Sequence, residues 1–180
     1  MSSKTAVNLP AWAAGVHAIS RAFGVASALL ILLSIFVICH MVFVRAVLGA
    51  SSIWQTEFVT FSVIAATFLG SPYILLTGGH VAVDLVPLMV RSETRRVMFL
   101  VGYAVALAFV GFYLVASVPW WLEAWHSGQT TPSIWKARLW IPYAAVPVGL
   151  FLLCLQMITD MILVASRRQL PFGLSPEEGL

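Results

Sequence analysis

Long uncharged stretches separated by short charged segments dominate the pattern of hydrophobic and polar positions along this chain. The four stretches cover residues 22–44, 58–77, 97–122 and 139–159. An α-helix over residues 22–44 would be roughly 34 Å long at about 1.5 Å per residue, enough to cross the hydrocarbon core of a bilayer. Because backbone polar groups in lipid must pair within the segment, we predict that each stretch is a transmembrane helix. The predicted fold class is an all-α membrane protein, with one four-helix transmembrane domain over residues 1–180.

The composition strengthens this prediction. Hydrophobic residues make up 61% of the chain and charged residues 9%, and the mean hydropathy is +0.96. Soluble domains carry about 25% charged residues, and a chain of this size cannot bury so much apolar surface on its own. Both cysteines, Cys39 and Cys154, lie inside apolar stretches, so a disulfide framework is not expected.

The distribution of lysine and arginine predicts the orientation of the chain. Seven of the ten lie in the N-terminal segment, the middle loop and the C-terminal segment, and three lie in the two other loops. The positive-inside rule therefore predicts that both termini lie in the cytoplasm. A group of tryptophans at the opposite end of spans three and four resembles an interfacial aromatic belt: Trp120, Trp121, Trp125, Trp135 and Trp140.

The loop between spans two and three contains a distinctive turn. Gly78 and Gly79 are expected to end the second helix, and Asp84 is expected to cap a short interfacial helix that runs toward Arg96. We interpret His80 and Asp84 as residues that hold this turn by capping and local hydrogen bonds. A polar contact with a partner subunit or a proton relay is the alternative.

Charged residues near the membrane do not indicate a catalytic or transport site within this chain. Glu57 and Asp160 lie at the ends of their spans, where water or lipid headgroups are expected to reach them. No acidic or basic residue lies deep in a span, which argues against a self-contained ion pathway. No phosphate-binding loop, metal cluster or nucleophile motif is present, so we predict no enzyme activity, no catalytic residue, no metal and no cofactor.

Two further expectations concern the helices themselves. Pairs of small residues at four-residue spacing, such as Ala66 and Gly70, permit close helix approach, and we expect the face carrying that pair to contact a partner. A haem- or quinone-binding anchor subunit of an oxidoreductase is the alternative function. Axial ligation of a haem iron requires two histidines at matching depth on facing spans, and the histidines of this chain do not lie in such positions.

Several short motifs occur in an order that resembles the small membrane (permease) subunit of tripartite ATP-independent periplasmic (TRAP) transporters, DctQ-like. They are Trp54–Glu57 before the second span, Phe68–Gly70 within it, the turn from Gly78 through His80 and Asp84 to Leu85, and Pro147–Gly149 with Gln156 in the fourth span. The resemblance covers nearly the whole chain, and the turn is its specific motif. Ala82 is a departure, because many members carry a basic residue there.

The resemblance implies a function that composition and spacing do not supply. It implies a small, non-catalytic subunit of a sodium-driven transporter that imports organic anions such as C4-dicarboxylates. The implied partners are a large permease subunit, which holds the substrate and sodium sites, a periplasmic solute-binding protein, and membrane lipids. The small subunit would act as a scaffold for the large one. No nucleic acid partner is implied.

Overall fold

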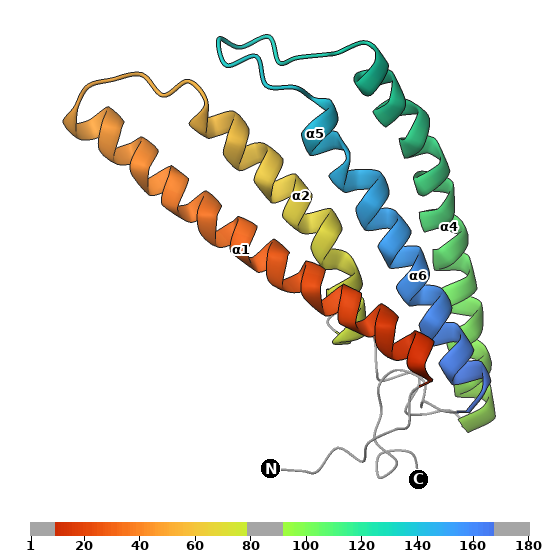
Figure 1. Cartoon of the computed structure of the whole chain (residues 1–180). Helices are drawn as coiled ribbons and strands as arrows, with labels where there is room; N and C mark the ends of the chain where they lie inside the picture. Colours follow the sequence, from red (N-terminus) through yellow and green to blue (C-terminus); the bar gives the residue numbers. More distant parts are fainter. Residues whose placement is uncertain (1–9, 79–91, 168–180) are drawn as a thin grey trace, which may run out of the picture.

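The computed structural model describes residues 10–78 and 92–167, and both ranges are helical apart from their loops (Figure 1). The helices are α1 (Ala11–Val47), α2 (Gln55–Leu76), α4 (Ser92–His126), α5 (Trp140–Tyr143) and α6 (Ala145–Ala165). The described residues form no strand, only an isolated bridge between Thr130 and Arg138. Four segments are long and apolar enough to cross a membrane, namely α1, α2, α4, and α5 together with α6. The predicted all-α fold with four such helices is confirmed.

The helices extend beyond the uncharged stretches from which they were predicted. α1 begins at Ala11 rather than residue 22, and α6 continues past Asp160 to Ala165. Arg21, which lies inside α1, can reach the headgroups without ending the helix, because its long side chain extends along the helix surface. Residues 92–96 lie in the first turns of α4. The rest of the expected interfacial helix lies outside the described residues.

A proline explains why the fourth span is divided into α5 and α6. The helix is interrupted at Ala144, although the backbone N–H of Ala144 still donates to the carbonyl of Trp140 at 3.2 Å. Pro147 has no N–H to donate to the carbonyl of Tyr143, so the regular hydrogen-bond ladder fails at this point. Pro72 and Pro119, by contrast, lie inside continuous helices.

α6 lies at the centre of the arrangement, between α2 and α4, and α1 packs on the far side of α2 (Figure 1). We call the end where α1 begins and α6 ends the terminal end, and the opposite end the loop end. α1 also packs against α6 near the terminal end. Toward the loop end, the α1–α2 pair diverges from the α4–α6 pair (Figure 1).

Candidate functional site

Gly149 brings α6 into direct contact with the backbone of α2. A Cβ atom at this position would overlap the carbonyl group of Phe68. Only glycine therefore permits this helix approach, which is the usual reason for small residues between membrane helices. Phe68 and Gly149 belong to two of the short motifs noted in the sequence, and the structure shows that they form one contact.

Gly70 has a comparable role between α2 and α1. A Cβ atom at Gly70 would lie 3.2 Å from the Cβ and Oγ atoms of Ser27. Ala66, one turn away, is also buried. α1 of the same chain therefore covers this face of α2, contrary to our expectation that it contacts a partner subunit. Sequence spacing identified a packing face correctly but not the helix that packs on it.

A buried polar cluster connects α1 to α6 near the terminal end, and we define it as His17, Ser20, Gln156 and Asp160. The Ser20 hydroxyl donates to Oε1 of Gln156 at 2.9 Å, and Nε2 of Gln156 donates to Oδ1 of Asp160 at 2.9 Å. Nε2 of His17 lies 3.9 Å from the same Asp160 oxygen. Gln156 is fully buried, and the other three residues are buried as well. The cluster therefore fastens two helices that have few other contacts.

The burial of Asp160 overturns our expectation that water or headgroups reach it. Asp160 is only 8% exposed, because α1 packs over this part of α6. The sequence did contain a signal for the cluster. His17 and Ser20 are three residues apart and Gln156 and Asp160 are four apart, so each pair lies on one face of its helix. On α1 the small or polar residues Ala13, His17, Ser20, Gly24 and Ser27 continue this buried face.

Aromatic side chains gather at the loop end, as the sequence predicted. Trp120 stacks on Tyr143 with ring centroids 4.0 Å apart, and Trp125 meets Trp140 edge-on at 4.4 Å. The indole N–H of Trp121 donates to the carbonyl of Trp140 at 3.0 Å. These contacts join the end of α4 to α5.

Trp54 and Glu57 lie where α2 begins, also at the loop end. The Trp54 ring contacts Phe58 edge-on and lies 6.4 Å from the Trp135 ring, which ties the start of α2 to the loop before α5. Glu57 is half-buried, and its Oε2 atom has no hydrogen-bond partner among the described residues. Acidic residues in the first turn stabilise a helix through its dipole, which accounts for the position of Glu57.

The remaining predicted residues are distributed as follows. Pro147 lies in the first turn of α6, next to the interruption, and is half-buried. His80 and Asp84 lie outside the described residues. Within the part of the chain that the structure describes, no group of three potential metal ligands is present.

The histidines give the haem-anchor hypothesis no support. His40 of α1 and His126 of α4 are both exposed, and α2 and α6 lie between those two helices (Figure 1). His17 lies at the terminal end, in the polar cluster. Axial ligation requires two imidazoles that face each other across one space, and these described histidines do not.

Comparisons with known proteins agree with the resemblance noted from the motifs. The family profile "Tripartite ATP-independent periplasmic transporters, DctQ component" matches residues 34–167. Curated relatives include the C4-dicarboxylate TRAP transporter small permease protein DctQ of Rhodobacter capsulatus, 24% identical over 68% of this chain and 54% of the relative. The protein of the same name from Pseudomonas aeruginosa is 27% identical over 61% of this chain and 53% of the relative.

The matched regions span about half the length of these curated relatives. No solved structure matches the chain. The family profile covers the last part of α1 and all of α2, α4, α5 and α6, including Gly70, Gly149, Gln156 and Asp160. On this match, the chain belongs to the family of the DctQ component, the small permease, of tripartite ATP-independent periplasmic transporters.

Proposed function

We propose that this chain is the small, non-catalytic permease subunit of a sodium-driven TRAP-type transporter that imports organic anions such as C4-dicarboxylates. The observation that carries the proposal is the family match over residues 34–167. The relatives named as C4-dicarboxylate small permeases support the choice of substrate class. The large permease subunit and a periplasmic solute-binding protein are the proposed partners.

The internal packing supports a scaffold role rather than a transport pathway. Gly149 and Gly70 hold α6, α2 and α1 at close distance, and the polar cluster fastens α1 to α6. Ser20, Gln156 and Asp160 are already hydrogen-bonded to one another within the chain. A static helix layer of this kind suits a subunit against which a transport domain moves.

We further propose that the chain lies in the bacterial inner membrane with both termini in the cytoplasm. The excess of lysine and arginine on that side supports this orientation. The loop end, with its aromatic residues, would then face the periplasm. In this arrangement His80 and Asp84 hold the cytoplasmic turn, while Trp54, Glu57 and Pro147 shape the periplasmic end.

The proposal is tested by reconstitution. The chain, its large permease and its binding protein are placed in liposomes in all combinations, and uptake of radiolabelled succinate is measured with and without an inward sodium gradient. We expect uptake only when all three proteins and the gradient are present. Uptake by this chain alone would contradict a non-catalytic role, and undiminished uptake without this chain would contradict a scaffold role.

A further inference from the structure

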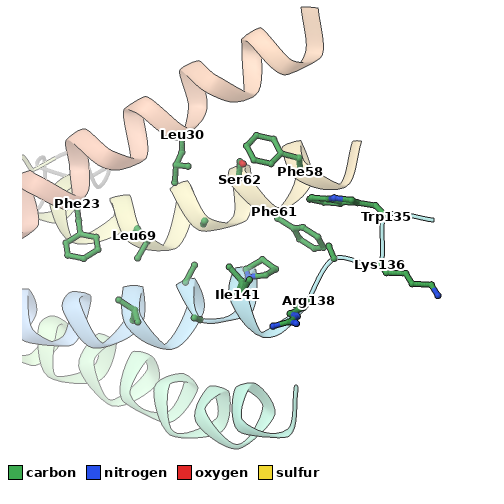
Figure 2. Close-up of a pocket in the computed structure, with 16 residues that line it drawn as sticks. Phe23, Leu30, Phe58, Phe61, Ser62, Leu69, Trp135, Lys136, Arg138 and Ile141 are labelled. Carbon is green, nitrogen blue, oxygen red and sulfur yellow. The ribbon is translucent and has the colours of Figure 1, made fainter. Parts of the chain in front are cut away.

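An apolar groove opens at the loop end, between the α1–α2 pair and α5–α6, where the helices diverge (Figure 2). Its volume is about 680 Å³, within the range of roughly 300–1,000 Å³ that small-molecule sites occupy. Figure 2 shows Phe61 of α2 and Ile141 of α5 on opposite sides, with Phe23 and Leu30 contributed by α1. Most of this lining is apolar, so a ligand with an apolar body is the chemistry that the groove suits.

Two positively charged side chains lie at the open end, or mouth, of this groove. Lys136 and Arg138 belong to its lining, together with Trp135, and no acidic residue does. Among the described residues neither cationic side chain forms an ion pair. Figure 2 shows both at the loop-end margin, beyond the apolar walls. The charge at the mouth therefore favours a ligand with an anionic head and an apolar body.

The loop that carries these cations is held in place by its own hydrogen bonds. The backbone N–H of Thr131 donates to the carbonyl of Ala137 at 3.0 Å, and the N–H of Ala137 donates to the Thr131 hydroxyl at 3.0 Å. Lys136 adopts a positive φ of 48°, a backbone conformation that residues other than glycine rarely take. The hydrogen bonds fix this turn, so the backbone that carries Lys136 and Arg138 is positioned before any ligand arrives.

The depth of the groove matches one leaflet of a bilayer. Its lining runs along α2 from Phe58 to Leu69, a stretch of roughly 16 Å at about 1.5 Å per residue. The hydrocarbon core of a bilayer is about 30 Å thick, so the groove extends from the interface to about the midplane. Trp54 and Trp135, which pack together beside the mouth, mark the interfacial level.

We propose that this groove binds one anionic phospholipid. The acyl chains lie along the apolar walls, and the phosphate and headgroup contact Lys136 and Arg138. Guanidinium groups pair well with phosphate oxygens, and cationic pockets between membrane helices favour anionic lipids. The site does not depend on the proposed transport role, because it is built from residues of this chain alone.

Native mass spectrometry of the full chain in detergent, titrated with phosphatidylglycerol or phosphatidylcholine of identical acyl chains, tests the headgroup. We expect one retained phosphatidylglycerol, with an affinity on the order of tenfold above that for phosphatidylcholine. The double variant Lys136→Gln/Arg138→Gln should lose this preference. Arg45→Gln, at the same end but outside the groove, is the matched control and should keep it. Equal affinity for the two lipids in the unaltered chain would overturn the proposal.

A second pair of variants tests the groove itself and remains informative if the loop variants misfold. Ala65→Trp places an indole in the groove from α2 and should abolish retention of either lipid, whereas Ala104→Trp on the exposed surface of α4 should not. Far-UV circular dichroism confirms that both variants are folded. Retention by Ala65→Trp equal to that of the unaltered chain would overturn the proposal.

The remaining occupant to distinguish is a helix of another subunit. Ala65→Cys, made in a chain without Cys39 and Cys154, is tested in the assembled complex with a photoactivatable cross-linker on the introduced thiol. Cross-linking to phospholipid supports the proposal. Cross-linking to a protein subunit assigns the groove to that subunit and overturns it.

Discussion

α4 and α6 have the same mean hydropathy over their most apolar windows, yet they occupy opposite environments. In that window 56% of the residues of the span containing α6 are buried within the chain, compared with 6% in α4. Val105, Phe112 and Val115 of α4 are each at least two-thirds exposed, whereas Leu163 of α6 is completely buried. Hydropathy therefore identifies a membrane helix without indicating whether it packs on other helices.

Small residues alone do not account for the difference either. Gly102 and Gly111 of α4 have no atom near the position of a Cβ, while Gly149 of α6 meets the backbone of Phe68. In lipid, apolar side chains gain little by leaving the bilayer for another helix, so association depends on close packing and on polar pairing. α6 combines both, and this combination places it at the centre.

The largest expected effect comes from Gly149→Leu, with Gly111→Leu as its counterpart on α4. The leucine at position 149 must displace the carbonyl of Phe68, and overpacking of this kind lowers the free energy of unfolding by about 3 kcal/mol. The change at position 111 meets open space and should have almost no effect. Helix content followed by circular dichroism during sodium dodecyl sulfate titration measures both. Equal losses of unfolding free energy in the two variants would contradict the conclusion that α6 is closely packed and α4 is not.

Leu163→Ala, compared with Leu122→Ala on α4, should give the next largest difference. Leu163 is 0% exposed and Leu122 is 39% exposed. The buried truncation leaves a cavity and should cost about 2 kcal/mol of unfolding free energy. At position 122 lipid fills the vacated space. The same titration measures the two values, and a comparable cost at Leu122 would indicate that α4 is covered on that side.

Gln156→Leu should give a smaller loss and would show how much the polar cluster contributes. The change removes the bond from Ser20 of α1 and the bond to Asp160 within α6, and the loss of two such bonds amounts to about 1.5 kcal/mol. Ser117→Ala on α4 is the counterpart, because its hydroxyl bonds only to the carbonyl of Leu114 in its own helix. A double-mutant cycle with Ser20→Ala isolates the bond across the helices. A coupling energy of zero in that cycle would show that the polar cluster does not stabilise the contact between α1 and α6.

The family motifs acquire physical reasons once the helices are packed. Gly70 and Gly149 are the positions where a Cβ would meet Ser27 and Phe68, and Gln156 bridges α1 and α6. Residue order along the chain could not reveal these contacts, because each joins segments more than forty residues apart in sequence. The burial of Asp160 escaped prediction for the same reason, since α1 covers it from a distant part of the chain.

The sequence by itself determined the number of membrane helices, their approximate limits and the aromatic end of the molecule, because apolar length and interfacial residue preference are local properties. It also carried the motifs by which the family was identified. Only the tertiary structure decided that α6 is central, that α1 covers Gly70, and that Lys136 and Arg138 lie at the open end of an apolar groove. These features depend on which faces of distant helices meet. In lipid that choice is made by shape and polar pairing rather than by hydropathy.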